Sequence, residues 1–313
     1  MQAHRIPTIY FIGVTTGRSS IMRVFPRWAE RLGLTATIRG VDFAIHDRPD
    51  AYRGIVAEIR EDPLSLGALV TTHKLDLLCA ARDLFDELGP YARLLGEVSC
   101  ISKAEGRLIG EAMDPISSGL ALDAFLPTDH WPRSGGETFL MGAGGAALAM
   151  TANLIERAAR RMPCPSRIIV SNRSPGRLSE MRSIHARLCP KVKIDYVLAP
   201  RAEDNDRVLE RLPPGSLVVN ATGLGKDRPG SPVTDTAQFP MWGIAWDFNY
   251  RGDLHFLEQA RRQQQDRGLL LEDGWVYFLH GWTRVISEVF HVEIPVSGPV
   301  FNMLSDVAAD ARS

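Results

Sequence analysis

Short apolar runs alternate along the chain with longer segments in which apolar residues recur at helical spacing. A short apolar run bounded by glycine or polar residues is typical of a buried strand, and helical spacing predicts an amphipathic helix. The alternation therefore predicts an α/β protein. The expected strands are residues 7–14, 36–44, 67–70, 96–101, 107–111, 139–141, 167–170, 191–197, 216–220, 243–247 and 269–271. The expected helices are residues 22–32, 50–61, 75–88, 114–125, 148–159, 254–267 and 275–290.

A glycine cluster lies between a strand and a helix in the middle of the chain. Gly142, Gly144 and Gly145 follow the apolar run 139–141, and an Ala-rich segment with helical spacing comes next. Gly142 would let the backbone turn sharply, and Gly144 would keep a Cβ away from a diphosphate bound at the positive end of the helix. The spacing is GxGG and not the full GxGxxG, so an ordinary tight strand–helix turn stays an alternative.

The next strand, residues 167–170, runs into Asn172, and its distance from the glycines fits one βαβ unit of a dinucleotide-binding fold. A fold that prefers NAD usually carries Asp or Glu at this strand end, where the carboxylate binds the ribose hydroxyls. Arg173 and Arg177 stand here instead, and a guanidinium matches a 2′-phosphate. The residues therefore favour NADP, with a solvated surface charge as the alternative for both arginines.

Composition narrows the classes of function. The chain has 313 residues and a formal net charge of −1, so there is no electrostatic case for binding nucleic acid or an acidic membrane surface. No apolar run reaches membrane-spanning length, and the N-terminus lacks the apolar core of a signal peptide, so we expect a cytoplasmic protein. Four cysteines without CxxC spacing argue against a metal site and are typical of free thiols: Cys79, Cys100, Cys164 and Cys189.

Further motifs follow one another along the chain. A Ser-rich loop follows the first strand, a later strand runs into a turn ending in Lys74, and a Gly-x-Val hairpin precedes an Asp that opens a helix. The remaining motifs are Gly142-Ala143-Gly144-Gly145-Ala146, Asn172-Arg173-Ser174-Pro175-Gly176-Arg177, Asn220-Ala221-Thr222-Gly223-Leu224-Gly225, Asp247-Phe248-Asn249-Tyr250 and a final helix after Gly274. No single motif is decisive, but their order and spacing together are specific. In these motifs the chain resembles the shikimate/quinate dehydrogenase family over nearly its whole length.

The resemblance implies two domains with a cleft between them, an N-terminal α/β domain that binds substrate and a Rossmann-type domain that binds NADP. We expect the first in residues 1–118, completed by C-terminal helices in residues 274–313, and the second in residues 119–273. The implied activity is the reversible reduction of a ketone on a hydroxylated cyclohexene carboxylate. The partner would be a small cyclic hydroxy acid, and the protein would be a monomer or a homodimer.

The catalytic pair of the family matches Lys74 and Asp114. When a nicotinamide delivers hydride to a ketone, the forming alkoxide needs a proton, which an ammonium can donate while a neighbouring carboxylate keeps it charged and in position. Taken without the resemblance, Lys74 would be a solvated charge at a helix start. Asp114 would be an N-cap before Pro115, a role that is compatible with catalysis.

The resemblance assigns the other site residues by position. Tyr250 matches a substrate-contacting tyrosine, with a half-buried aromatic at a domain edge as the alternative. The expected substrate-binding residues are Ser19, Ser20, Thr71, Ser99, Tyr250 and His280. The expected cofactor-binding residues are Gly142, Ala143, Gly144, Gly145, Ala146, Asn172, Arg173, Ser174, Arg177, Asn220, Thr222, Gly225 and Gly274.

The substrate side departs from the family pattern. The family has a Ser-x-Ser pair where Ser19 and Ser20 are adjacent here, and a Thr where this chain has Val70. A histidine, His280, stands in place of a glutamine, with a satisfied core or surface histidine as the alternative. Each unmatched buried polar group costs about 1–3 kcal/mol, so several such changes would shift substrate preference steeply. The other departures are Thr72 for Pro, Ser99 for Asn and Ala112-Met113 for Asn-Thr.

Three functions stay open on the sequence alone. The first is an NADP-dependent oxidoreductase on shikimate, or on quinate or another related hydroxy acid if the site is modified. The second is a non-catalytic NADPH-binding sensor, against which the pair Lys74 and Asp114 argues. The third is another two-domain Rossmann enzyme, such as a methylene-folate dehydrogenase, against which the blocks 220–225 and 247–250 argue.

Overall fold

The computed structural model describes residues 6–226 and 228–311. The chain divides into two compact units, Met1–Met113 with Leu279–Ser313, and Asp114–Phe278. The expected domain boundaries, after residues 118 and 273, lie close to these. The assignment of substrate to one unit and cofactor to the other stays a prediction.

The first unit is built on a mixed sheet. Its strands are β1 (Thr8–Gly13), β2 (Thr37–Asp42), β3 (Ser65–Val70), β4 (Glu87–Leu88), β5 (Cys100–Ala104) and β6 (Arg107–Glu111). Its helices are α1 (Ile21–Leu32), α2 (Pro49–Glu61), α3 (Lys74–Ala81), α4 (Pro90–Leu95) and α13 (Pro299–Ala309), with short 3₁₀ turns η1 (Thr16–Arg18) and η2 (Arg82–Leu84). The strand order is β2-β1-β3-β5-β6-β4, and β1 pairs in parallel with both β2 and β3.

The C-terminal segment completes the core of the first unit. A long helix, α12 (Trp275–Phe290), begins in the second unit and ends in the first. Within the first unit the ring of Trp282 meets that of Phe11 on β1 edge to face at 5.1 Å. The indole N–H of Trp28, on α1, donates to the carbonyl of Leu304 on α13 at 2.8 Å. Because each large side chain buried here contributes about 1.5–3 kcal/mol, the segment is integral to this unit.

The sequence pattern misjudges several segments, among them the strand expected over 96–101, of which only Cys100 and Ile101 lie in β5. The helix expected over 75–88 is wrong, because α3 ends at Ala81 and the chain then forms η2 and the strand β4. Leu88 pairs with Gly110 of β6, so sheet pairing outweighs the apolar spacing that suggested a helix. The helix expected over 254–267 is broken into α10 (His255–Arg261) and α11 (Gln264–Arg267), and a short helix that was not among the expected ones, α6 (His130–Ser134), precedes the second sheet.

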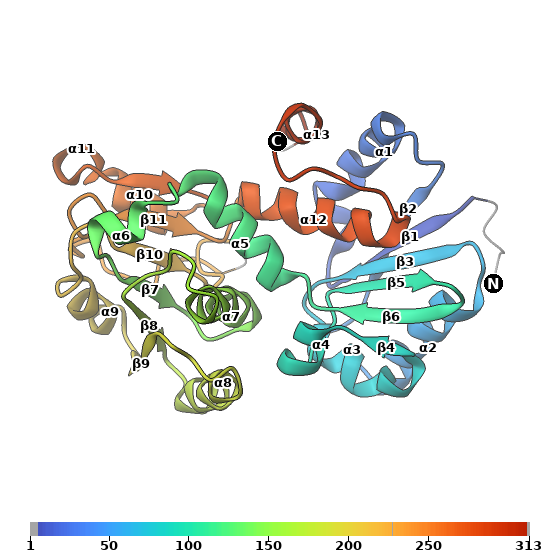
Figure 1. The fold of residues 1–313 in the computed structure, drawn as a ribbon, viewed down its shortest axis with the longest axis horizontal. Helices are drawn as coiled ribbons and strands as arrows, with labels where there is room; N and C mark the ends of the chain where they lie inside the picture. Colours follow the sequence, from blue (N-terminus) through green and yellow to red (C-terminus); the bar gives the residue numbers. More distant parts are fainter. Residues whose placement is uncertain (1–5, 227, 312–313) are drawn as a thin grey trace. The chain divides into compact units, whose positions relative to one another are not determined.

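The second unit is built on a fully parallel sheet. Its strands are β7 (Thr138–Met141), β8 (Arg167–Asn172), β9 (Lys193–Leu198), β10 (Leu217–Asn220), β11 (Ile244–Asp247) and β12 (Leu270–Glu272). Its other helices are α5 (Asp114–Phe125), α7 (Gly145–Ala159), α8 (Pro175–Arg187) and α9 (Ala202–Leu209). The strand order is β12-β11-β10-β7-β8-β9, which is the doubly wound order of Rossmann folds with β7 as first strand (Figure 1).

Apolar strands explain why this sheet is buried on both faces. Every residue of β7, β10 and β11 is buried, as expected for a parallel sheet covered by helices on both sides. Helix α5 packs closely on α7, since a Cβ on Gly119 would lie 2.4 Å from the side chain of Asn153. No helix in the described residues is long and apolar enough to cross a membrane.

Candidate active site

The glycine turn lies where the strand order of the second unit reverses. Strand β7 has β8 on one side and β10 on the other, and ligands of doubly wound folds bind at the carboxyl ends of strands at such a point. Gly142 follows β7 directly with φ +114, and a Cβ on it would lie 2.6 Å from the carbonyl oxygen of Ala221. Only glycine fits this position, because both its backbone angle and its neighbour exclude a side chain.

Gly144 differs from Gly142 in its surroundings. It is the N-cap of α7 with φ −91 and ψ −175, and a Cβ on it would meet no atom within 4 Å. The first turn of α7 carries no acidic residue, so the positive end of the helix and its N–H groups are not neutralised by a carboxylate. The absence of a side chain at Gly144 therefore leaves room for a diphosphate, and the turn fits the dinucleotide predicted from the sequence.

Two arginines follow the end of β8, and only one of them forms an ion pair with a described residue. The side chain of Asn172 accepts a hydrogen bond from the backbone N–H of Ser174 at 2.9 Å, and Ser174 is the N-cap of α8. Arg177 pairs with Glu180 at 3.0 Å. Arg173 is exposed, and its side chain has no hydrogen bond or ion pair with any described residue. Arg173 is therefore the arginine that can bind an anion without breaking an existing pair.

The loop after β10 is held by the buried side chain of Asn220, which is itself bound by the buried carboxylate of Asp247. Asn220 is the last residue of β10, and its side-chain oxygen accepts from the N–H of Thr222 at 3.1 Å and from its hydroxyl at 2.6 Å. The Asn220 amide donates to the carboxylate of Asp247 at 3.0 Å. Burial raises the pKa of Asp247 to about 6. The sequence motifs contained Asp247 and Asn249 but did not single them out as site residues, although an Asp-x-Asn at a strand end was a usable signal.

Tyr250 and Gly274 lie beside this loop. The ring of Tyr250 packs against Trp275 at 5.4 Å and Phe278 at 4.9 Å between ring centroids, so one of its faces belongs to an aromatic cluster. A Cβ on Gly274 would lie 2.1 Å from the carbonyl oxygen of Phe248. The structure thus requires glycine at 274 for backbone packing, and its contact with a cofactor stays a prediction.

In the first unit, three of the predicted substrate residues lie in the loops that follow β1 and β3. Thr71 follows β3, and both its N–H and its hydroxyl donate to the carbonyl of Ile12 on β1, at 2.9 and 3.2 Å. Ser19 and Ser20 lie between η1 and α1, and Ser20 is buried while Ser19 is half-buried. Because β1 and β3 are parallel neighbours, their two loops meet at one edge of the sheet.

Lys74 is the first residue of α3 and is partly exposed. Its carbonyl accepts from the N–H of Val98 at 3.3 Å, which ties the start of the helix to the hairpin. The preceding residue, His73, is buried and its Nδ1 lies 3.0 Å from the hydroxyl of Tyr52. The N–H of Lys74 donates to the carbonyl of Thr71 at 3.2 Å, so its backbone is fixed on both sides.

The remaining predicted site residues have defined local roles. The Ser99 hydroxyl is buried and accepts from the backbone N–H of Met113 at 2.7 Å, so it fixes the end of β6. His280 is buried and its ring stacks on that of Phe301 at 4.6 Å between centroids, and its contact with a substrate stays a prediction. Asp114 opens α5 as its first residue, in the second unit, and its pairing with Lys74 in the first unit stays a prediction.

No metal-binding cluster of three or more His, Cys, Asp or Glu residues occurs in the described part of the chain. Among described residues the four cysteines are free thiols, with Cys100 buried. The donor groups at both strand edges are hydroxyls, amides, backbone N–H groups and cations. Such groups bind anions and hydroxylated ligands.

Comparisons with known proteins agree with the fold and the family resemblance described above. No protein-family model matches the chain. The curated shikimate dehydrogenase (NADP(+)) of Methylobacterium radiotolerans is 29% identical over 277 residues, which cover 88% of each chain. A solved shikimate dehydrogenase in complex with NADP+ has a TM-score of 0.76 at 18% identity, covering 100% of this chain and 98% of that one. A quinate dehydrogenase from Corynebacterium glutamicum in complex with NAD has a TM-score of 0.72 at 17% identity, covering 97% and 98%.

These matches confirm the resemblance to the shikimate/quinate dehydrogenase family and the α/β fold predicted from the sequence. The curated relative carries the activity in its name, whereas the solved structures are too distant in sequence to show more than the fold.

Proposed function

We propose that this chain is an NADP-dependent dehydrogenase that interconverts a ring hydroxyl and a ring carbonyl on shikimate or a close analogue. The observation that carries the proposal is the glycine turn at the point where the strand order of the parallel sheet reverses. Packing in the fold requires glycine at position 142, but it does not require glycine at position 144. A glycine that packing does not require, at the N-terminus of a helix whose first turn carries no acidic residue, is what diphosphate binding needs. The curated relative supplies the substrate class.

Lys74 and Asp114 would handle the proton. When bound, the nicotinamide supplies or accepts the hydride at the ring carbon. The ammonium of Lys74 would donate a proton to the oxygen in the reduction and take it back in the oxidation. The carboxylate of Asp114 would hold that ammonium charged and oriented, which is the usual way a carboxylate assists a lysine.

Arg173 supports NADP over NAD. No acidic residue occupies the end of β8, and Arg173 extends there without a partner among the described residues. A guanidinium pairs with the 2′-phosphate through charge-assisted hydrogen bonds, which are roughly twice as strong as neutral ones. The curated relative is named for NADP+ as well.

The substrate is the open part of the proposal. Ser99, which replaces the family's asparagine, already accepts a hydrogen bond from Met113. Its oxygen is thus engaged within the first unit and offers a substrate less than the asparagine it replaces. His280, which replaces a glutamine, is buried and stacks on Phe301, and an imidazole presents different hydrogen-bonding groups from an amide. We infer that the hydride and proton chemistry is retained while the preferred ring acid differs from shikimate, with quinate or another hydroxylated or aminated analogue as candidates.

A steady-state assay tests the proposal directly. Shikimate and quinate are each offered with NADP+ and with NAD+, and the NADPH or NADH formed is followed. Turnover of at least one acid with NADP+ supports the proposal. Efficient turnover of shikimate at ordinary enzyme rates supports the dehydrogenase but contradicts the altered substrate preference.

One substitution with a matched control distinguishes an enzyme from a non-catalytic NADPH-binding sensor. Lys74→Ala is compared with Lys191→Ala, which changes an exposed lysine of the second unit. For an enzyme, Lys74→Ala lowers kcat by about 10²–10⁴-fold with NADPH binding retained, because general acid–base catalysis is lost, and Lys191→Ala changes neither. NADPH binding without turnover of any offered acid by the unmodified protein would favour a sensor.

A further inference from the structure

A buried carboxylate at the end of β11 takes no part in the chemistry proposed above. Asp247 is fully buried. Its Oδ2 accepts from the Asn220 side chain at 3.0 Å, and its Oδ1 accepts from the backbone N–H and the side-chain amide of Asn249 at 2.9 and 2.8 Å. Burial raises the pKa of Asp247 to about 6 even though these hydrogen bonds act in the opposite direction. The chain thus retains a carboxylate where burial opposes its charge.

The two amides that Asp247 binds share a second acceptor. The Asn220 and Asn249 side chains both donate to the carbonyl oxygen of Leu224, at 3.2 and 3.1 Å. Each amide has two hydrogens, so one is used on the carboxylate and the other on Leu224. The carboxylate therefore fixes the orientation of both amide groups. Both amides in turn hold the carbonyl of Leu224 in place.

The same orientation fixes the start of the loop. With its NH₂ group directed at Asp247 and Leu224, Asn220 presents its side-chain oxygen to the N–H and hydroxyl of Thr222. The Thr222 hydroxyl in turn accepts from the N–H of Leu224 at 3.2 Å. Residues 221–225 are therefore held by one connected network, in which Asp247 is the only ionisable member among the residues that the structure describes.

This loop adjoins the glycine turn on the side away from Arg173. Ala221 donates its N–H to the carbonyl of Met141 at 2.9 Å and approaches Gly142 closely. A dinucleotide whose diphosphate lies at Gly144 and whose 2′-phosphate lies at the end of β8 extends its other half toward β10. Residues 221–225 are therefore the segment that meets the nicotinamide half.

We propose that Asp247 is a positioning residue for the cofactor, which acts by orienting Asn220 and Asn249 so that the loop 221–225 is fixed in the shape that binds the nicotinamide half. The inference rests on the proposed function, since it requires that the second unit binds NADP(H). It assigns Asp247 no contact with cofactor or substrate.

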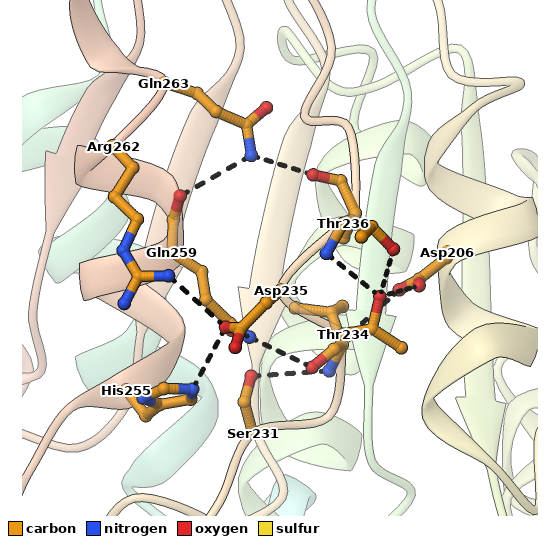
Figure 2. A network of polar contacts seen from close by, with 11 residues as sticks. Asp206, Ser231, Thr234, Asp235, Thr236, His255, Gln259, Arg262 and Gln263 are labelled. Carbon is orange, nitrogen blue, oxygen red and sulfur yellow. Dashed lines mark hydrogen bonds and ion pairs between the residues drawn. The ribbon is translucent and has the colours of Figure 1, made fainter.

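A second buried carboxylate in the same unit provides a matched control. Asp206, on α9, accepts from the N–H of Thr234 at 3.1 Å and from the Thr234 hydroxyl, and so holds the loop 234–236 (Figure 2). It is 9% exposed. Asp206 thus performs for another loop the task proposed for Asp247, but that loop does not contact the glycine turn through any hydrogen bond among the described residues.

The test compares Asp247→Asn with Asp206→Asn. In Asp247→Asn, one carboxylate oxygen becomes an NH₂ group that faces N–H donors, so at least one hydrogen bond of the network is lost. We measure the dissociation constant of NADPH by its fluorescence, without substrate, and amide hydrogen exchange by mass spectrometry. Asp247→Asn should raise the dissociation constant about tenfold and speed exchange in residues 222–225. Asp206→Asn should leave the dissociation constant within about twofold and speed exchange only around residues 234–236.

The outcomes separate the two proposals. If the unmodified protein binds NADPH and Asp247→Asn binds it equally well, the positioning role is overturned and the proposed function stands. If the unmodified protein does not bind NADPH, the proposed function fails and the inference fails with it. If Asp247→Asn does not fold, Asn249→Ala replaces it, because this change removes the same link to Leu224 and should raise the dissociation constant by about three- to fivefold.

Discussion

The two glycines of the turn after β7 should respond oppositely to the same substitution. Gly142→Ala places a Cβ 2.6 Å from the carbonyl oxygen of Ala221 at φ +114. Gly144→Ala places a Cβ in a position with no atom within 4 Å, at an ordinary negative φ. The structure therefore requires glycine at 142 for packing and not at 144, where a need for glycine would come from a ligand.

The magnitudes follow from these surroundings. For Gly142→Ala, backbone strain costs about 1–3 kcal/mol and the contact with Ala221 adds to it, so we expect a loss of about 2–4 kcal/mol in the free energy of unfolding. For Gly144→Ala, the poorer N-cap is offset by the lower entropy of the unfolded chain, so the change should stay within about 1 kcal/mol. The new methyl group would block charge-assisted hydrogen bonds from the helix start to the diphosphate, worth about 1.5–3 kcal/mol, or about 10- to 150-fold in affinity.

Two measurements on each variant decide the matter. Urea denaturation followed by circular dichroism gives the free energy of unfolding, and titration with NADPH gives the dissociation constant. We expect Gly144→Ala to be nearly as stable as the unmodified protein and to bind NADPH at least tenfold more weakly. If Gly144→Ala binds NADPH with unchanged affinity, the diphosphate does not lie at this turn and the cofactor part of the proposed function is wrong.

Three further predictions concern single side chains. Arg173→Asp should raise the KM for NADP+ by at least tenfold, because the new carboxylate repels the 2′-phosphate. The KM for NAD+ should stay nearly unchanged or fall, because a carboxylate suits the free ribose hydroxyls. Steady-state kinetics with both nucleotides checks this. Asp114→Asn should lower kcat much more than it changes the dissociation constant of NADPH, since it leaves Lys74 without its charged partner; kcat unchanged would remove Asp114 from the proposed pair. His185 is buried, and burial lowers its pKa from 6.5 to about 4, so as the pH falls the unfolded chain takes up the extra proton before the folded protein does. The protein should therefore lose about 3 kcal/mol of its free energy of unfolding between pH 7 and pH 4 through this group. A His185→Gln variant should not show this loss, and urea denaturation across the pH range checks it.

The parallel sheet of the second unit could be predicted because its signals are local. Each strand is a short apolar run, and the expected strands 167–170, 216–220 and 243–247 coincide with β8, β10 and β11 within two residues at each end. The glycine turn could be recognised for the same reason, since strand, glycines and helix follow one another without interruption. The backbone geometry of such a turn is determined by consecutive residues.

The errors occur where distant contacts decide the structure. Residues 82–88 have an apolar spacing that suits a helix, but Asp86 accepts from the N–H of Leu108 at 2.8 Å and Leu88 pairs with Gly110. These partners lie more than twenty residues further along the chain, so no local pattern could reveal them. The network around Asp247 was missed in part for the same reason: its Asp-x-Asn signal is local, but Asn220 meets Asp247 only when β10 and β11 pair.

This difference also explains why the cofactor is easier to infer than the substrate. The predicted diphosphate site is made of main-chain groups and the absence of side chains, so glycine positions alone define it. The substrate side depends on which hydroxyls and amides are already used within the protein. Ser99 illustrates the problem: its position matches a family residue that binds a ring hydroxyl, but its oxygen already accepts the N–H of Met113. Ser99→Asn should therefore disturb the end of β6 before it restores any contact, so that its kcat/KM for shikimate falls together with stability. A rise in kcat/KM at unchanged stability would show instead that the site has room for the family's asparagine.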